Sequence, residues 1–320
     1  MDSHDPGSVT VATPGAAPPA WQQQAERGTH RGVRLMIATA RLLGRRLSQI
    51  ILLIVALYFL LRGGPVRAAS TDYLRRVLGR APTWSERLRH LHTFAACALD
   101  RAFLLLDSGG LQLAWHADAR TRDVESEHGC LVIMSHIGSF EALRVPTARQ
   151  VRLPIRIVMD RRHNAAVTDL LESLDPDLAS RVIDVSDGGP ALVLAMREAL
   201  ARGEVVGLMG DRMRAAERGV TVRFLGDRAQ LPISPWALAS VLGCPVYLGF
   251  GLYLGGGRYE CHLERFAERI ELPRERREEA LQACAQRYAD RMEHHLRTVP
   301  YNWFNWYSYW MPSNVDEPRT

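Results

Sequence analysis

The feature that most constrains the fold is an alternation of short apolar runs and helical stretches between residues 130 and 209. The runs cover 130–134, 155–159, 182–185 and 205–209, and the charged residues within them are Arg156 and Asp184. Each is as long as a strand buried on both faces of a sheet. Helical periodicity separates the runs, over about 140–150, 165–174 and 190–201. Since crossover helices join parallel strands, the sequence predicts an α/β fold with a mixed, largely parallel sheet flanked by helices.

The pattern continues toward the C-terminus with strands expected at 221–224, 245–253 and 258–263 and a charged helix at 274–297. The glycines at 255–257 are expected to turn the last two strands into a hairpin. They are not a phosphate-binding loop, because no G-x-x-x-x-G-K-[ST] motif occurs and the chain has no lysine to complete one. Two further helical stretches are expected before the first strand, at 73–78 and 87–106.

The predicted organisation has four parts. Residues 1–28 are rich in Pro, Gly, Ala and Gln, have little to bury, and are expected to be disordered. A basic and apolar helix that associates with membranes is expected at 29–66. The α/β domain then covers 67–311, and 312–320 form a C-terminal tail.

Residues 47–61 carry the membrane signal, since only Ser48 and Gln49 interrupt this apolar run. As a helix it covers about 22 Å at 1.5 Å per residue, which is short of the roughly 30 Å hydrocarbon core of a bilayer. Arginines on both sides favour a helix lying in an anionic leaflet. Two alternatives stay open. One is a signal peptide cleaved near 68–70, with Arg45-Arg46 as a twin-arginine export signal, and the other is a helix buried in the core.

Composition narrows the possible partners. The five cysteines are odd in number and lack C-x-x-C spacing, which indicates reduced thiols in a cytoplasm-facing protein and no metal site. A pI near 9.1 fits an anionic lipid or a phosphorylated cofactor. Nucleic acid is disfavoured, because zinc-finger spacing, an RNP-like strand and a basic helix-turn-helix are all missing.

His136 and Glu141 are the first candidates for chemistry. The strand at 130–134 delivers His136 to its carboxyl end, where sites of open α/β sheets lie, and Gly138-Ser139 permits a sharp turn into the next helix. We expect Glu141 to fix the imidazole tautomer while His136 acts as general base toward a hydroxyl or amine. The alternative is a buried structural histidine bonded to a glutamate.

Two further strand ends carry charged and polar side chains. Arg161, Arg162 and Asn164 follow the run at 155–159, and Asp211-Arg212 follow the run at 205–209. If the strands are parallel, these loops share one sheet edge with the predicted histidine base. An arginine of the first loop would bind a phosphate or an oxyanion, and Asp211 with Arg212 would form a positioning pair. The alternative is that both are charged loops in solvent.

The segment 301–310 holds seven aromatic residues among ten. Such density is typical of core closure, of a pocket for an acyl chain or headgroup, and of the bilayer interface. We expect it to close the core with some interfacial contact.

In chain order these features resemble the lipid A late acyltransferases of the lysophospholipid acyltransferase superfamily. The shared features are a membrane-seeking N-terminal helix, a strand ending in H-x-x-x-x-E, a strand ending in Gly-Asp, F-L-G and C-P-V segments, and a Trp-rich end. The resemblance covers about residues 31–311 and implies a fold like that of the glycerolipid acyltransferases. His136-x-x-x-x-Glu141 is its most specific element and matches the family's catalytic pair.

Two departures mark a divergent member. Asp211 matches the aspartate of the family's Asp-Gln element, but Arg212 stands where glutamine is usual. A basic His-Arg-Arg type signature near the Trp-rich end is replaced by Asn302-Trp303-Phe304-Asn305. Both departures weaken the case for lipid A itself as the acceptor.

The resemblance implies transfer of a fatty acyl group from an acyl-carrier-protein or acyl-CoA thioester to a hydroxyl or amine of a membrane lipid or glycolipid. His136 would act without a covalent intermediate, a metal or a cofactor, and Arg161, Arg162 or backbone N–H groups would stabilise the oxyanion. The expected location is a bacterial inner membrane, with the catalytic domain facing the cytoplasm. The alternatives are a non-catalytic, membrane-associated lipid- or acyl-binding protein on the same scaffold, and a soluble hydrolase.

Overall fold

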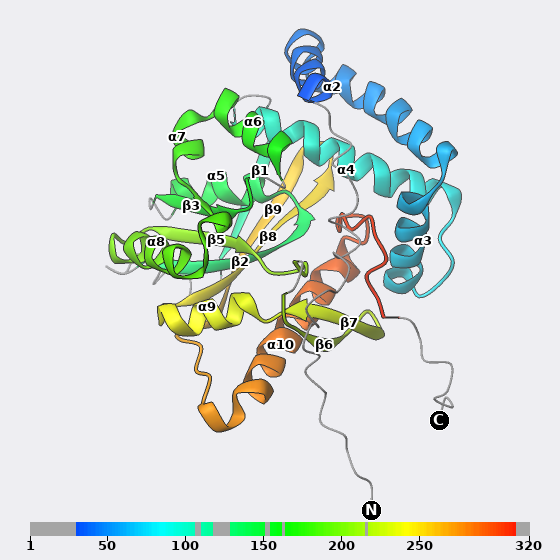
Figure 1. Ribbon diagram of the computed structural model, residues 1–320. Coiled ribbons are helices and arrows are strands. Elements are labelled where there is room, and N and C mark those ends of the chain that lie inside the picture. Colours follow the sequence, from blue (N-terminus) through cyan, green and yellow to red (C-terminus); the bar gives the residue numbers. More distant parts are fainter. Residues whose placement is uncertain are drawn as a thin grey trace, which may run out of the picture.

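The computed structural model describes residues 30–105, 110–117, 129–150, 154–161, 164–214 and 217–311. The predicted disordered segment 1–28, the tail 312–320 and Arg162 lie outside these ranges. Within them, seven strands form one sheet in the order β1-β9-β8-β2-β5-β3-β4, and two more form a separate hairpin (Figure 1).

The bounds of the elements are as follows. The large sheet contains β1 (Gln112–Ala117), β2 (Cys130–Gly138), β3 (Ile155–Met159), β4 (Val182–Asp184), β5 (Val205–Met209), β8 (Val246–Gly255) and β9 (Arg258–Ala267), and the hairpin contains β6 (Gly219–Phe224) and β7 (Asp227–Pro232). The α-helices are α2 (His30–Arg62), α3 (Pro65–Leu78), α4 (Trp84–Leu105), α5 (Phe140–Gln150), α6 (Ala165–Leu174), α7 (Pro176–Ser180), α8 (Gly189–Ala201), α9 (Ser234–Leu242) and α10 (Arg277–Thr298).

The sheet confirms the predicted fold class. β2 pairs in parallel with β5 and β8, and β3 pairs in parallel with β5 and β4. β8 and β9 form the expected antiparallel hairpin, whose turn passes through glycines with positive φ. The sequence prediction missed β1, an edge strand whose residues 112–116 alternate between exposed and half-buried, and also β7, which begins with two exposed charged residues.

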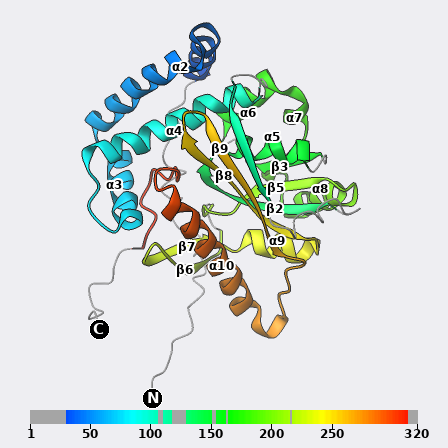
Figure 2. The ribbon, with the colours of Figure 1, turned by 180° about the vertical axis from the view of Figure 1, so that it is seen from behind.

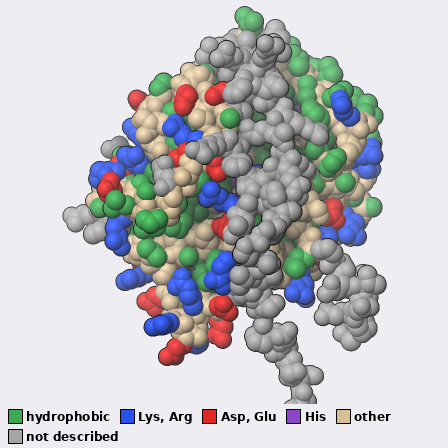
Figure 3. Space-filling model, viewed as in Figure 1, with side chains coloured by type: hydrophobic (Ala, Val, Ile, Leu, Met, Phe, Trp, Pro, Cys, Tyr) green, Lys and Arg blue, Asp and Glu red, His purple; other side chains and the backbone are tan. Residues whose placement is uncertain are grey.

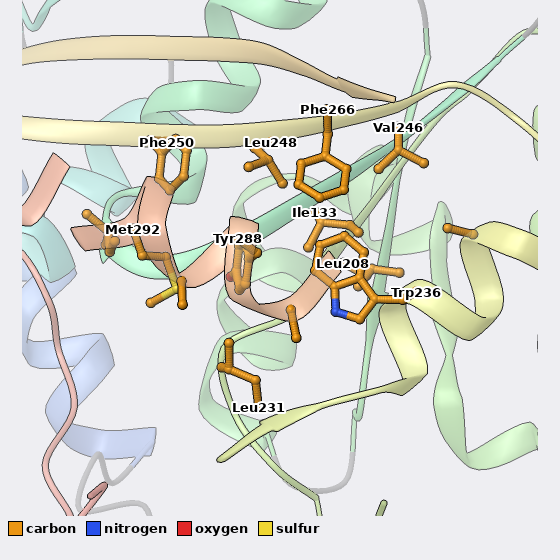
Figure 4. Close-up of a cluster of buried hydrophobic side chains, with 14 of the residues drawn as sticks. Ile133, Leu208, Leu231, Trp236, Val246, Leu248, Phe250, Phe266, Tyr288 and Met292 are labelled. Carbon is orange, nitrogen blue, oxygen red and sulfur yellow. The ribbon is translucent and has the colours of Figure 1, made fainter. Parts of the chain in front are cut away.

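Helices cover both faces of the sheet (Figure 2). Residues 131 and 133 of β2 pack into the core cluster formed with α3, α8, α9 and α10, whereas residues 130, 132 and 134 pack against α4 and α5. This period of two is why the run 130–134 is apolar throughout. Figure 4 shows the α10 side, where Tyr288 and Trp236 pack beside Ile133, with ring centroids of the two aromatic residues 5.7 Å apart.

Helix α2 breaks at Gly44, whose φ of 69° and ψ of 173° are not helical. Beyond the break one side of the helix packs on α4 and buries Ala56 and Leu60. Leu52 is partly buried against Leu99 and Phe103. Most of the other large apolar side chains are exposed: Leu47, Ile50, Ile51, Leu53, Ile54, Val55, Tyr58, Phe59 and Leu61. Figure 3 shows apolar side chains gathered along the upper right edge of the molecule, where α2 lies. The helix is therefore half-covered and is not a wholly buried core helix.

No single helix in the described part of the chain is long and apolar enough to cross a bilayer. The pair Leu47–Arg62 and Pro65–Leu78 passes the same test of length and composition when taken together, with a bend of 97° between its members.

A close approach of two backbones closes the end of β2. Gly138 has a φ of +66°, and a Cβ on it would lie 1.9 Å from the carbonyl oxygen of Gly251 in β8. A Cβ on Gly251 would lie 2.1 Å from the carbonyl oxygen of Ser139, whose N–H donates to the Gly251 oxygen at 2.8 Å. Glycine is required at both positions because a side chain would separate the two strands.

We therefore expect Gly251→Ala to lower the free energy of unfolding by roughly 3 kcal/mol, because backbone atoms must move to admit the methyl group. Gly189→Ala is the matched control, since no atom lies within 4 Å of its Cβ position, and it should change stability by less than about 0.5 kcal/mol. Chemical denaturation of both variants in detergent measures the difference. Equal midpoints for the two variants would contradict the close approach.

Candidate active site

His136 lies where β2 stops being regular. The strand runs four residues beyond the predicted end at 134, and its register with β8 shifts between Met134 and Gly138. Such an irregularity turns a side chain away from the pleat. The imidazole of His136 is accordingly about 30% exposed at the carboxyl edge of the sheet, whereas residues 130–135 are buried.

Asp211 holds His136 through two contacts. Asp211 Oδ1 lies 2.8 Å from His136 Nδ1, and Asp211 Oδ2 accepts the His136 backbone N–H at 3.0 Å. The parallel register explains the meeting, because Met134 pairs with Met209 and the two residues each stand two positions further on. Since the Asp211 carboxylate accepts, Nδ1 carries the imidazole proton and Nε2 is left unprotonated.

The charges around this pair set its protonation state. Burial raises the pKa of Asp211, but His136 and Arg212 outweigh burial and bring that pKa down to about 2. Burial lowers the pKa of His136, and the positive charges of Arg212 and Arg101 lower it further against the opposing effect of Asp211. At pH 7 the pair is therefore a carboxylate and a neutral imidazole, the state that a general base requires.

Glu141 does not orient His136, which corrects the sequence prediction for this contact. Glu141 lies in the first turn of α5, is only 3% exposed, and pairs with Arg101 of α4 through Oε1 and Nε at 2.9 Å. The turn through Gly138 carries α5 toward α4, so the glutamate faces that helix. The catalytic role predicted for His136 and Glu141 stays a prediction.

Arg101 is the site residue that sequence reasoning missed. It lies on α4 beside the fully buried Asp100, and its charge acts on His136. A signal was present in the sequence, because Asp100-Arg101 interrupts an otherwise apolar stretch at 95–106. Charged residues on a buried helix face need partners, and this stretch offered none locally.

The side chains of Arg161 and Asn164, in the loop after β3, contact neighbouring parts of the chain. Arg161 donates through Nη2 to Glu172 Oε1 at 3.4 Å and to the Ala179 carbonyl at 3.3 Å, which connects it to α6 and α7. Asn164 donates to the Asp160 carbonyl at 2.9 Å. The contacts described for Arg161 and Asn164 include neither His136 nor Asp211, and Arg162 lies outside the described residues.

The aromatic C-terminal segment encloses the site. Trp303 is fully buried and donates through Nε1 to Asp211 Oδ2 at 3.2 Å, and Tyr309 donates its hydroxyl to the Asp211 carbonyl at 2.8 Å. Phe304 connects the two sides, because its N–H donates to the His136 carbonyl at 3.1 Å and its carbonyl accepts from Arg212 Nη2 at 2.8 Å. Core closure is thus confirmed for Trp303 and Phe304, and the same segment also fixes the predicted base.

Three backbone N–H groups of the turn already donate to other parts of the chain. The N–H of His136 donates to Asp211, that of Gly138 to the Asn302 carbonyl at 2.8 Å, and that of Ser139 to the Gly251 carbonyl at 2.8 Å. These three groups are therefore not available to an oxyanion, and the positive charges that act on His136 are those of Arg101 and Arg212. Among the described residues, the groups spaced to hold a metal ion lie around His262 and not at this site.

A comparison with known protein families gives a match that covers the candidate site. A family model described as bacterial lipid A biosynthesis acyltransferase matches residues 120–310, more than half of the 320-residue chain. The matched range includes His136, Glu141, Asp211 and the aromatic segment but not Arg101. No curated protein matches the chain.

The charge analysis predicts how His136 titrates. Nuclear magnetic resonance of ¹³C-labelled histidine should give His136 a pKa below 6.5 in the wild type, and Arg212→Gln should raise it, because removing a nearby positive charge stabilises the imidazolium. Arg75→Gln, an exposed arginine on α3, is the control and should leave the His136 pKa unchanged. A wild-type value above 6.5, or no response to Arg212→Gln, would refute this account.

Proposed function

The chain belongs to the bacterial lipid A biosynthesis acyltransferase family, and from this premise we propose that it moves a fatty acyl group from a thioester to a membrane lipid. The donor is an acyl-carrier-protein or acyl-CoA thioester, and the acceptor is a hydroxyl or amine of a lipid or glycolipid. The observation that carries this proposal is the partly exposed imidazole of His136, held through Nδ1 by the buried carboxylate of Asp211.

In the proposed mechanism the acceptor attacks the thioester directly. The oxygen or nitrogen of the acceptor forms the new bond to the thioester carbonyl carbon with its lone pair. At the same time His136 Nε2 takes the proton from that oxygen or nitrogen. The tetrahedral oxyanion then collapses, the carbon–sulfur bond breaks, and the thiolate takes the proton from the imidazolium. Asp211 holds Nδ1–H and stabilises the imidazolium while it exists.

Arg101 is the proposed stabiliser of the oxyanion, in place of Arg161 and Arg162. Its side chain is about 32% exposed, its charge acts on His136, and its ion pair with the buried Glu141 fixes its position. A guanidinium at this place opposes the negative charge that develops on the carbonyl oxygen. Glu141 is thereby a positioning residue for Arg101.

The proposed location of the protein is the inner membrane. The exposed apolar side of α2 would lie in the surface of an anionic inner leaflet, with the α/β domain on the cytoplasmic side. Two features support this: the apolar side chains of residues 47–61 left exposed on α2, and the net charge of +5 on the chain.

An acyl-transfer assay with mass-spectrometric detection tests the function. Purified wild type is given mixed acyl-carrier-protein and acyl-CoA thioesters with a total lipid extract and should form a new acylated lipid. His136→Ala and Asp211→Asn should each lose about 10²–10⁴-fold in kcat, because each removes a working general base. His294→Ala, an exposed histidine on α10, is the control and should retain full turnover.

Glu141→Gln separates the two assignments of the orienting carboxylate. Glu141→Gln should lose less turnover than Asp211→Asn. Arg101→Gln should lose about as much turnover as Glu141→Gln, because Glu141 acts by holding Arg101. The reverse ranking would return the orienting role to Glu141. Thioester binding without product in any sample would favour the non-catalytic lipid- or acyl-binding protein.

Membrane association is tested by flotation with vesicles that contain anionic lipid. Ile50→Glu combined with Ile54→Glu should weaken binding by more than about tenfold, because burial of each such side chain contributes roughly 1.5–3 kcal/mol. Leu194→Glu combined with Val241→Glu is the matched control on α8 and α9, where both side chains are also exposed. Equal losses in both double variants would argue against a membrane-facing α2.

A further inference from the structure

Strands β1 and β9 form one edge of the large sheet (Figure 1). Three side chains with metal-binding groups, those of His116, Glu260 and His262, lie close together there. In the parallel pairing of these strands His116 stands directly opposite His262, and Glu260 precedes His262 by two residues on the same face. The two imidazole rings stack with centroids 4.9 Å apart and an angle of 14° between their planes. The three residues are half-buried or exposed, so an ion can reach them from solvent.

The spacing of the polar atoms fits a bound ion better than a direct contact. One ligand atom from each of His116, Glu260 and His262 lies within 4.8 Å of the others. Glu260 Oε2 and His262 Nε2 are 3.6 Å apart, which is too long for a hydrogen bond. Neighbouring ligand atoms of a tetrahedral zinc ion with bonds of 2.0–2.1 Å are separated by about 3.3 Å.

His262 also has an unsatisfied nitrogen. Its Nε2 is buried and has no hydrogen-bond partner among the described residues. A buried polar atom without a partner is costly, and a metal ion would satisfy it.

The neighbouring carboxylate is occupied elsewhere. Glu264 also lies near His262 and His295, but it accepts from Arg291 Nε at 2.7 Å and Nη2 at 2.8 Å and contacts His295 Nε2 at 2.7 Å. Glu264 is therefore neutralised by an arginine and bonded on both oxygens. Glu260 has no such partner among the described hydrogen bonds, which leaves it as the carboxylate ligand.

We propose that His116, Glu260 and His262 bind one divalent transition-metal ion, with zinc the best match to two imidazoles and one carboxylate. Water completes the tetrahedron. The ion connects the edge strand β1 to β9, its one neighbour in the sheet, and thereby stabilises that edge. This site is separate from the His136 centre and does not depend on the proposed acyl transfer.

The test uses the full chain, purified without a polyhistidine tag and stripped with chelator. Isothermal titration with ZnCl₂ should give one ion per chain at micromolar affinity or tighter, and Co²⁺ should give the absorption bands of a tetrahedral site. Saturating Zn²⁺ should also raise the melting temperature. His116→Ala and Glu260→Gln should each weaken zinc binding at least tenfold, whereas His294→Ala should bind as the wild type does.

His116→Ala is the decisive variant, because His116 is exposed on an edge strand and its removal leaves no cavity. Circular dichroism before titration verifies that each variant is folded. No uptake by the wild type, or unchanged affinity in His116→Ala, would overturn the proposal. Loss of binding in His295→Gln with full binding in His116→Ala would place the ion at Glu264 instead and would equally overturn it.

Discussion

The buried carboxylate of Asp211 is the constraint on which the rest of the site depends. Asp211 has no exposed surface, and an ionised carboxylate in that position is tolerated only when hydrogen bonds and positive charge surround it. His136 supplies a backbone and an imidazole contact, and Trp303 supplies a third donor. These partners come from β2 and the C-terminal segment, and Asp211 itself follows β5, so satisfying one charge brings three distant parts of the chain together. The fixed imidazole is a consequence of that arrangement.

Two carboxylates near His136 have different environments and therefore different tasks. Asp211 contacts the imidazole, whereas Glu141 faces α4 and holds Arg101. The resulting cation acts on His136 together with Arg212, and both oppose protonation of the imidazole. In the proposed mechanism the neutral imidazole is the base and the guanidinium of Arg101 opposes the charge that develops on the oxyanion. The H-x-x-x-x-E spacing thus reflects two linked interactions and not one contact.

The N-terminal helix is fixed to the domain by a second buried carboxylate. Arg45 donates from Nε and Nη2 to the fully buried Asp100 at 2.7 and 3.0 Å, and Tyr259 donates to the same carboxylate at 2.9 Å. Arg45 Nη1 also donates to the carbonyl of Gly256 in the β8–β9 turn at 3.1 Å. Because Asp100 precedes Arg101, a single segment of α4 connects the apolar helix on one side and the charge beside His136 on the other.

The sequence by itself determined the fold class and most strand positions, and it placed His136 at the carboxyl edge of the sheet. Buried strands show in the local pattern of apolar residues, and the strands at 155–159 and 205–209 were therefore placed correctly. The edge strand β1 is less buried and was missed. The sequence prediction also placed Asp211 at the same sheet edge as His136. Only the tertiary structure decided which carboxylate touches the imidazole, because β5 lies beside β2 although two strands separate them in the chain. Strand order and register depend on packing between distant segments, and no local pattern encodes them.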